Sequence, residues 1–421
     1  MKVLWITNLV FPEALQLLTG NGDLRASGGW LLGAAESLVQ TGKVQLAVAT
    51  VTPMINTSVS LLGKNIQYYL LPNGSGNQRK NDEYRKYWRA IVNEYNPDVV
   101  HIHGTEYSHG LSYVDECGSK NVCVSIQGLV GVYSRYYYEG LTISEIKKSA
   151  TIASVLKNGI LKGCRNFKRR GRYEKELLER VGHIIGRTSW DRAHAWAINP
   201  QARYHYGGEI LRMEFYDNSI WQYQCCIPHS IFVSQATLPL KGLHQILRAM
   251  PLVLRLYPDA TLRVAGPDIT RSRSSWMDTL KLSDWGKIVR RLIRENHLQE
   301  KVIFTGALNA EEMKQEYLKS NVFVCPSSIE NSPNSLGEAQ ILGVPVIASY
   351  VGGTMDMMRG DEDHLYRFEE VEMLAEKICL LFASEENQPQ VGLMRQHAIQ
   401  RHGAVQIIEN LMAIYHKVIN S

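Results

Sequence analysis

The 421-residue sequence predicts an α/β fold with two doubly wound parallel sheets. Short apolar runs alternate with amphipathic stretches along the chain, which is the pattern of strand–helix–strand units in parallel sheets. Two such sets follow one another, so we expect two Rossmann-like domains facing each other across a cleft. A hydrophobic content of 45% is sufficient for two separate cores.

The first set of alternating segments predicts a domain at 1–222, with a helix over 29–41. Its expected strands are 2–7, 44–51, 66–70, 99–103, 122–127 and 183–186. The second set predicts a domain at 223–400, with strands at 230–235, 261–265, 301–305, 322–325 and 345–349. Its expected helices are 243–257, 278–296, 310–320 and 335–342. Ligands in such sheets bind at the carboxyl ends of the strands.

Composition narrows the class of protein. Charged residues make up 21% of the chain and the net charge is +5, which indicates a globular protein and gives no signature of nucleic-acid binding. The seven cysteines form no CxxC pair and no Cys/His group with zinc spacing, so we expect reduced thiols and no metal. The first residues resemble a strand and not a signal peptide, and no apolar run is long enough to span a bilayer. We therefore expect a cytoplasmic protein.

The strongest motif contains two glutamates, Glu330 and Glu338, separated by a Ser/Pro/Asn-rich turn and the start of a helix. One carboxylate is expected on the loop and the other on the first turns of the helix. We expect Glu338 to bind a vicinal diol such as a ribose, and Glu330 to face a sugar. Two glutamates at this spacing on a solvated helix surface are the alternative, but the turn between them favours a ligand site.

The start of the helix between these glutamates is a ready anion site. Pro333 has no N–H to donate. The expected phosphate donors are therefore the next amides, those of Asn334, Ser335 and Leu336, aided by the helix dipole. A ligand that carries both a phosphate and hydroxyls, such as a nucleotide sugar, would suit this element.

Lys241 and Gly242 follow an expected strand and precede an amphipathic helix. A lysine at such a turn can hold a diphosphate as a point charge. Lys-Gly alone is usually a surface turn, and it becomes a candidate through its pairing with the glutamate element.

The first half of the chain carries weaker motifs. Gly28 and Gly29 precede a helix and would allow a ligand to approach the backbone, although an ordinary helix start is equally consistent. His101 and His103 lie on the same side of an expected strand, and no third residue has metal-ligand spacing. His103 and Glu106, at the strand end, are candidates to contact a sugar or an acceptor, with a structural histidine as the alternative.

A basic segment spans 152–175. It combines Ile152, Val155, Leu156, Ile160 and Leu161 with Lys157, Lys162, Arg165, Lys168, Arg169, Arg170, Arg172 and Lys175. Such a segment would rest on anionic lipid headgroups at the cytoplasmic face of the inner membrane. A solvated basic helix explains the same pattern, and the sequence leaves the two readings open.

Together these residues resemble the retaining GT-B glycosyltransferases of family 4 (glycosyl transferases group 1), of the surface-polysaccharide type. The resemblance rests on Lys241-Gly242, Val264-Ala265-Gly266, Phe304-Thr305-Gly306, Glu330 with Glu338, Gly343-Val344-Pro345-Val346 and Val351-Gly352-Gly353. In the first half it rests on Ser27-Gly28-Gly29, 101–106, Gln127-Gly128 and 186–191. It implies a nucleotide-sugar donor in the second domain, an acceptor in the first, no essential metal, and a last helix, about 405–419, that packs back on the first domain.

Two departures from the family pattern affect the site. The arginine usual before the lysine is absent from Ser234-Gln235-Ala236-Thr237, and Arg187 and Arg212 are the candidates to replace it. Gln127 stands where histidine is frequent, and glutamine cannot titrate.

We therefore predict transfer of a sugar, with retention, from a nucleotide-diphospho-sugar to a glycan or lipid-linked acceptor in surface polysaccharide synthesis. The candidate catalytic residues are Glu330, Lys241, His103 and Gln127. The candidate donor-binding residues are Gly28, Gly29, Lys241, Gly266, Asn334, Ser335, Leu336 and Glu338. A nucleotide-sugar epimerase on the same scaffold, or a non-catalytic nucleotide-sugar-binding partner of a transferase, are the alternatives.

Overall fold

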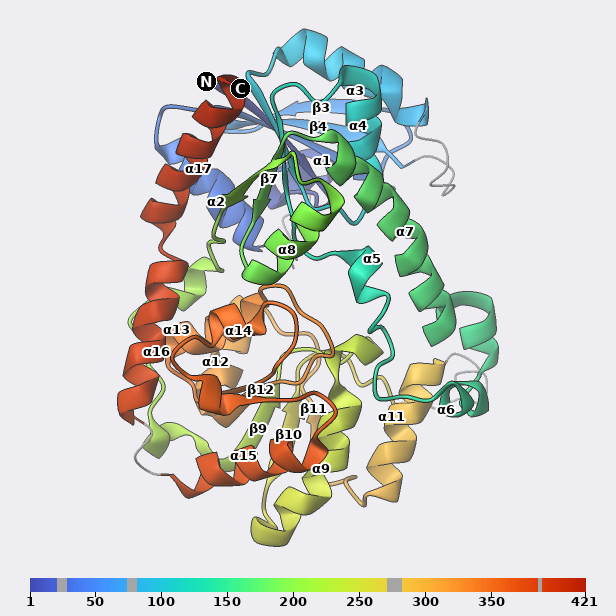
Figure 1. Ribbon diagram of the computed structural model, residues 1–421, viewed down its shortest axis with the longest axis vertical. Helices are drawn as coiled ribbons and strands as arrows, with labels where there is room; N and C mark the ends of the chain where they lie inside the picture. Colours follow the sequence, from blue (N-terminus) through green and yellow to red (C-terminus); the bar gives the residue numbers. More distant parts are fainter. Residues whose placement is uncertain (21–28, 74–81, 271–281, 385–387) are drawn as a thin grey trace. The chain divides into compact units, whose positions relative to one another are not determined.

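The computed structural model describes the chain except for residues 21–28, 74–81, 271–281 and 385–387, and the side chains of 82–83, 157–158 and 388–391 are also left aside. Contacts between residues divide the chain into two compact units (Figure 1). The first contains Met1–Val132, Lys168–Met213 and Arg401–Ser421, and the second contains Tyr133–Phe167 and Glu214–Gln400. Each unit is an α/β structure with a parallel sheet, as the sequence predicted.

The first unit contains an eight-stranded sheet in the order β3-β4-β2-β1-β5-β6-β7-β8. The strands are β1 (Lys2–Thr7), β2 (Gln45–Thr52), β3 (Val59–Leu62), β4 (Ile66–Pro72), β5 (Val99–His103), β6 (Val122–Ser125), β7 (His183–Gly186) and β8 (Arg203–Tyr206). All neighbours pair in parallel except β3 with β4. The strand order reverses between β1 and β5, and side chains at the carboxyl ends of these strands are therefore placed where doubly wound sheets bind ligands.

Helices cover both faces of this sheet. One face packs against α3 (Asp82–Tyr95), α4 (His109–Cys117), α8 (Ser189–Ile198) and the later part of α7 (Ile160–Arg180). The other carries α2 (Gly29–Gln40) and α17 (Ala404–Ile419), which contact each other and the strands β2 and β5. The shorter helices are α1 (Pro12–Thr19) and α5 (Val130–Tyr133). The last helix thus belongs to the first unit.

The second unit contains a six-stranded parallel sheet in the order β11-β10-β9-β12-β13-β14. The strands are β9 (Ile227–Val233), β10 (Thr261–Val264), β11 (Val302–Phe304), β12 (Ser320–Cys325), β13 (Val346–Ser349) and β14 (Leu365–Tyr366). Side chains alternate between the two faces, because Ile231 and Val233 join one core and Phe232 joins the other.

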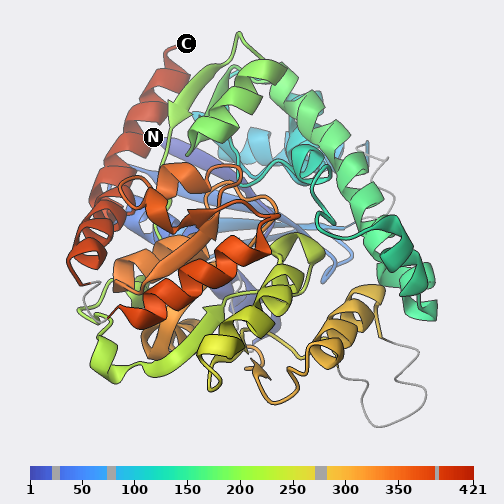
Figure 2. The ribbon, with the colours of Figure 1, turned by 60° about the horizontal axis from the view of Figure 1, so that its bottom comes forward.

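On one face of this sheet lie α9 (Leu243–Leu256), α11 (Asp284–Glu295) and α15 (Val371–Ala383), with α9 and α15 side by side (Figures 1 and 2). On the other lie α12 (Ala310–Lys319) and α13 (Asn334–Leu342). The remaining helices are α6 (Ile143–Lys148), α14 (Thr354–Met357) and α16 (Gln388–Arg401). No helix in the described ranges is both long and apolar enough to cross a bilayer.

The segment Tyr133–Phe167 corrects the sequence prediction, which assigned all of 1–222 to the first domain. Its contacts group it with the second unit. The reason is burial: Tyr137, Leu141, Ile146, Ile160 and Cys164 pack into the same hydrophobic core as the strands and helices of the second sheet. Removing these side chains from water outweighs their proximity in sequence to the first sheet.

Candidate functional site

Lys241 and Gly242 lie at the carboxyl end of β9, where a single 3₁₀ turn, Pro239–Lys241, leads into α9. Gly242 has a φ of 73°, in the left-handed region that favours glycine. A Cβ atom at this position would lie 1.7 Å from the carbonyl oxygen of Pro326, which follows β12. Glycine therefore lets the loop with Lys241 approach the loop with Glu330.

Glu330 forms an ion pair with Lys241. The Nζ of Lys241 lies 2.6 Å from Oε1 of Glu330, and Oγ of Ser327 donates to the same oxygen at 2.7 Å. Burial alone would lower the pKa of Lys241, but the charge and hydrogen bond of Glu330 outweigh it and the pKa is raised. The carbonyl of Glu330 accepts from the N–H of Gly353 at 3.0 Å. The sequence predicted separate roles for Lys241 and Glu330, and the structure brings their charges into contact.

The start of α13 follows this loop, with Pro333 as its N-cap residue. The carbonyl of Pro333 accepts from the N–H of Leu336 at 3.0 Å. The prediction that the Leu336 amide is available to a phosphate is therefore wrong, because a tight first turn already uses it. Within the described part of the chain, no bond to another group is seen for the amides of Asn334 and Ser335, and these two remain the predicted phosphate donors.

Glu338 is buried on α13, one turn after these amides. The hydroxyl of Tyr317, on α12, lies 3.4 Å from its Oε2 and donates to the carbonyl of Ser335 at 3.0 Å. The carboxylate is thus positioned from a neighbouring helix and is not a member of a solvated helix surface.

Gly266 follows β10 and has a φ of 108°. Its N–H and carbonyl pair with those of Gly306, after β11, at 3.0 and 3.1 Å. A Cβ on either glycine would meet no atom within 4 Å, so the backbone conformation alone calls for glycine here. The sequence singled out Gly266, and the pairing with Gly306 is an addition from the structure.

The first unit contains a pocket of about 50 Å³ at the carboxyl ends of β1, β5, β6 and β7. Its polar lining is His101, His103, Ser125, Gln127, Arg187 and Glu209. Its apolar lining includes Trp5, Trp30, Ile185, Ile210, Ile407, Leu411 and Ile414. The pocket brings together His103 and Gln127, two of the predicted residues, with side chains from α2 and α17.

His101 has a structural role in this pocket. Its Nδ1 lies 2.8 Å from the Tyr415 hydroxyl, which also accepts from Nε1 of Trp5 at 2.8 Å. The other ring nitrogen, Nε2, lies 2.6 Å from Oγ of Ser125, so both nitrogens of His101 have hydrogen-bond partners. This chain attaches α17 to the sheet and fixes His101 as a neutral histidine. Burial lowers its pKa to about 3.

His103 is different. It is 7% exposed, and neither ring nitrogen has a hydrogen-bond partner among the described residues. Its ring lies 3.7 Å from that of His101 and 4.3 Å from that of Trp5. Burial and the neighbouring His101 lower the pKa of His103 well below its usual value. It is a neutral histidine that can donate one hydrogen bond and accept another, and a polar ligand in the pocket would satisfy both.

Gln127 is held by Arg187, whose guanidinium donates to the Gln127 carbonyl at 2.9 Å and to that of Ile126 at 3.1 Å. Arg187 also forms a buried ion pair with Glu209. Its charge is therefore balanced within the first unit, which argues against Arg187 as the replacement for the missing phosphate arginine. Arg212, the other candidate, contacts the start of α2, where a Cβ on Gly29 would lie 3.1 Å from its Cγ.

The remaining sequence predictions concern Gly28, Gly29 and the absence of a metal site. Gly28 lies outside the described residues, and Gly29 is the first residue of α2. In the described ranges no group of three or more His, Cys, Asp or Glu side chains could hold a metal ion. Sequence reasoning missed Glu209 and the wall formed by α17. The Gly207-Gly208-Glu209 triplet after β8 was the signal available for the first, whereas the second depends on tertiary packing.

Comparison with known proteins agrees with this architecture. Residues 228–394 match the family model described as glycosyl transferases group 1. Spore coat protein SA of Bacillus subtilis is 27% identical over 183 residues, 42% of this chain and 46% of that protein. The capsular polysaccharide biosynthesis glycosyltransferase CapM of Staphylococcus aureus is 27% identical over 177 residues, 42% of each chain. The matched regions span less than half the length of these relatives.

Solved structures resemble the whole chain. Sucrose-phosphate synthase from Thermosynechococcus elongatus superposes with a TM-score of 0.70 and 17% identity, covering 100% of this chain and 99% of that one. Anabaena Alr3699/HepE in complex with UDP-glucose gives a TM-score of 0.66 and 13% identity, covering 99% and 100%. The chain therefore has the GT-B fold, and its residues 228–394 match the glycosyl transferases group 1.

Proposed function

We propose that the protein is a glycosyltransferase that moves a sugar from a nucleotide-diphospho-sugar to a glycan or lipid-linked acceptor, with retention at the anomeric carbon. The observation that carries this proposal is the contact between Lys241 and Glu330 beside the start of α13, with Glu338 one turn further along the helix. A cation, a helix N-terminus and a carboxylate for a diol are the groups that a nucleotide diphosphate requires. The similarity of residues 228–394 to glycosyl transferases group 1 supports it.

In this proposal the diphosphate competes with Glu330 for Lys241. When it binds, Lys241 and the amides of Asn334 and Ser335 stabilise the leaving phosphate, and Glu330 is released toward the sugar. Such preorganised donors act most strongly on the charge that develops as the glycosidic bond breaks. Among the described residues we identify no covalent nucleophile, so we propose that the leaving phosphate accepts the proton of the acceptor hydroxyl while that oxygen bonds to the anomeric carbon.

For the acceptor we propose the pocket of the first unit, with His103 and Gln127 binding its hydroxyl groups. Aromatic rings beside unsatisfied polar atoms suit a saccharide, whose ring has apolar faces and a polar edge. The likeness to a capsular polysaccharide biosynthesis glycosyltransferase supports a role in surface polysaccharide synthesis.

The test is an assay of the purified chain with UDP-, GDP-, ADP- and CMP-sugars, preceded by thermal-shift ranking, since a bound donor raises the melting temperature. Transfer of labelled sugar to a lipid-linked or glycan acceptor, with the anomeric configuration kept, is expected. Release of nucleoside diphosphate from donor alone, with epimerised sugar, would favour the epimerase. Donor binding without turnover across the acceptor panel would favour the non-catalytic partner.

We also propose that the reaction needs no metal. Transfer measured with excess EDTA is expected to equal transfer measured with added Mg²⁺ or Mn²⁺, because groups of the protein, among them Lys241 and the α13 amides, stabilise the leaving group. A rate that falls with EDTA and returns with either cation would contradict this.

The membrane contact of 152–175 is part of the same proposal, at the cytoplasmic face of the inner membrane. Between Glu145 and Glu174 the sequence has nine Lys or Arg residues and no Asp or Glu. Within the second unit, Lys147, Lys148, Lys162 and Arg165 are exposed, and the side chain of Lys157 lies outside the described residues. Such cations add about 1 kcal/mol each near an anionic surface.

Beside these cations the protein exposes Ile152 at 57%, Val155 at 72% and Leu156 at 66%. Three exposed aliphatic side chains next to a purely basic stretch favour a lipid surface over solvent. Co-sedimentation with phosphatidylcholine vesicles containing phosphatidylglycerol is expected, and is expected to weaken with salt. The variant Val155→Asp with Leu156→Asp should lose it, whereas Leu256→Asp, at another exposed leucine, should not. Equal sedimentation of both variants would contradict the surface.

A further inference from the structure

We propose that Arg135 supplies the second positive charge for the donor diphosphate, in place of the arginine that is missing before Lys241. The inference rests on the proposed function and identifies a further residue of the same site. It comes from the segment Tyr133–Gly140, which the contacts place in the second unit although it follows the first sheet in the chain.

The site needs another cation. Lys241 is already matched by Glu330 at 2.6 Å. This pair has no net charge, so it brings no net positive charge to a diphosphate that carries several negative ones. The segment 234–237, between β9 and Lys241, contains no basic residue. A second cation, as we propose it, therefore comes from elsewhere in the chain.

The segment that contains Arg135 is in direct contact with both donor loops. The Oγ of Ser328 donates to the carbonyl of Tyr136 at 2.8 Å and lies 3.3 Å from the carbonyl of Leu240. The N–H of Ser328 donates to the same Leu240 carbonyl at 2.8 Å. Tyr136 is thus one hydrogen bond from the residue two positions before Glu330, and through Ser328 it is linked to the residue before Lys241. Arg135 is the residue directly before Tyr136 in the chain.

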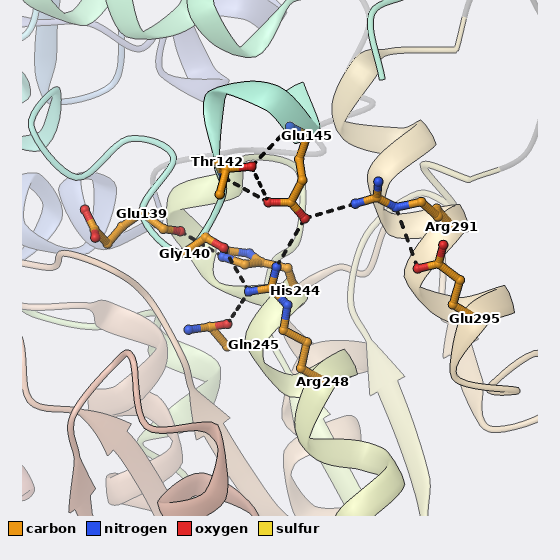
Figure 3. A network of polar contacts seen from close by, with 9 residues as sticks. All are labelled: Glu139, Gly140, Thr142, Glu145, His244, Gln245, Arg248, Arg291 and Glu295. Atoms are coloured by element: carbon orange, nitrogen blue, oxygen red, sulfur yellow. Dashed lines mark hydrogen bonds and ion pairs between the residues drawn. The ribbon is translucent and has the colours of Figure 1, made fainter. Parts of the chain in front are cut away.

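Hydrogen bonds attach the end of this segment, Glu139 and Gly140, to α9, as Figure 3 shows. The buried ring of His244, at the start of α9, bonds through Nε2 to the carbonyl of Glu139 at 2.8 Å, and Arg248 donates to the carbonyl of Gly140 at 2.8 Å. A Cβ on Gly140, whose φ is 77°, would lie 2.8 Å from Nε2 of His244. The segment therefore packs closely against α9, the helix that begins two residues after Lys241.

The same network continues to α11. The carboxylate of Glu145 lies 3.7 Å from Arg248 and 3.1 Å from Arg291, and it closes a capping box with Thr142 (Figure 3). In this network the arginines Arg248 and Arg291 are therefore paired with the carboxylate of Glu145. Arg135 is exposed, and none of the described residues forms a hydrogen bond or ion pair with it. Among the described residues its guanidinium has no counter-ion, and its backbone is hydrogen-bonded beside the donor loops. A planar guanidinium is suited to phosphate oxygens.

The test compares the affinities of nucleoside diphosphate and monophosphate by calorimetry for the wild type, Arg135→Ala and Arg135→Lys. The diphosphate used is the one that gives the largest thermal shift with the wild type. Arg135→Ala is expected to lower its affinity about 10- to 100-fold, as for one charge-assisted hydrogen bond, and to lower the diphosphate-to-monophosphate ratio. Arg135→Lys is expected to restore part of both.

The matched control is Arg255→Ala, which removes an exposed arginine at the far end of α9 in the same unit. Arg255→Ala is expected to leave the affinities for diphosphate and monophosphate unchanged. Melting temperatures of the variants check that each one is folded. An unchanged diphosphate affinity and ratio in Arg135→Ala, beside a wild type that binds diphosphate, would overturn the role of Arg135 alone. A wild type that binds no nucleoside diphosphate would overturn this role together with the proposed function.

Discussion

The two units present their polar groups in opposite ways. In the second unit the key charges are matched: Lys241 pairs with Glu330, Ser327 donates to the same carboxylate, and Tyr317 reaches Glu338. In the first unit the pocket keeps His103 buried with both ring nitrogens unsatisfied by the described residues. A buried cation such as Lys241 is costly without a partner, and Glu330 supplies that partner. A site for a neutral, hydroxylated ligand can leave neutral atoms unpaired at a smaller cost.

The largest expected effect concerns the matched pair. Lys241→Ala removes the cation on the leaving phosphate, and we expect kcat/KM for transfer to fall by roughly 10³-fold, about 4 kcal/mol, as for loss of one charge-stabilising donor. For His103→Ala, in the other unit, kcat/KM is expected to fall by far less. The measurement is initial-rate kinetics with the best donor and acceptor. A Lys241→Ala enzyme within tenfold of the wild type would break the comparison.

The glycines of the second unit provide the next effect. Gly242→Ala is expected to lower the free energy of unfolding by about 3 kcal/mol or more, because the effects of a positive φ and of a clash with the Pro326 carbonyl add together. Gly266→Ala is expected to cost about 1 kcal/mol, since it has the positive φ without a clash. Urea unfolding of both variants gives the difference. Equal losses would show that close approach of the two donor loops is not what requires Gly242.

Acid should separate the two units. Burial lowers the pKa of His101 to about 3 and that of His109 to about 4 in the first unit, and that of His244 to about 3 in the second. The unfolded chain takes up these protons near pH 6.5, so the stability is fully present above that pH and is lost as the pH falls below it. Each fully buried histidine then costs about 1 kcal/mol per pH unit.

The first unit has more such histidines, because the pKa values of His103, His205 and His402 are lowered as well. We therefore expect hydrogen exchange at pH 5.5 to show earlier opening of β5, β6 and α17 than of β9 and β12. His101→Asn should reduce the pH dependence of the unfolding free energy. Uniform opening of both units on acidification would contradict the contrast.

The smallest effect concerns His103. His103→Phe keeps a ring against Trp5 and removes both nitrogens, so we expect unchanged or slightly higher stability and an acceptor KM raised about tenfold, as for the loss of one hydrogen bond. His101→Phe instead breaks the chain through Tyr415 and Ser125 and should destabilise the protein by about 2 kcal/mol. The reverse order of stabilities would exchange the roles assigned to the two histidines.

The sequence predicted the second unit better than the first. Lys241, Gly266, Glu330 and Glu338 all lie at strand ends or helix starts, and the local pattern of strand, turn and helix places such residues without knowledge of packing. The Leu336 amide was misassigned because a tight first helical turn depends on geometry that composition does not show. The ion pair of Lys241 with Glu330 joins two loops 89 residues apart, and no local pattern predicts it.

The rest depends on tertiary packing. Strand β3 was missed because its residues alternate between half-buried and exposed without strong apolar character, and β14 because it is only two residues long. The segment Tyr133–Phe167 was assigned to the first domain since its core residues, such as Tyr137 and Ile160, are buried by helices more than 80 residues later. The pocket wall from α17 likewise comes from the far end of the chain.

We propose that the second unit alone contains the nucleotide-diphosphate site. Hydrogen exchange of the full chain with and without the preferred nucleoside diphosphate tests it most directly. We expect slower exchange in 238–242, 327–331 and the first turn of α13, with exchange in β5, β6 and α17 unchanged. Slower exchange confined to β5, β6 and α17, with the loops around Lys241 and Glu330 unaffected, would contradict it.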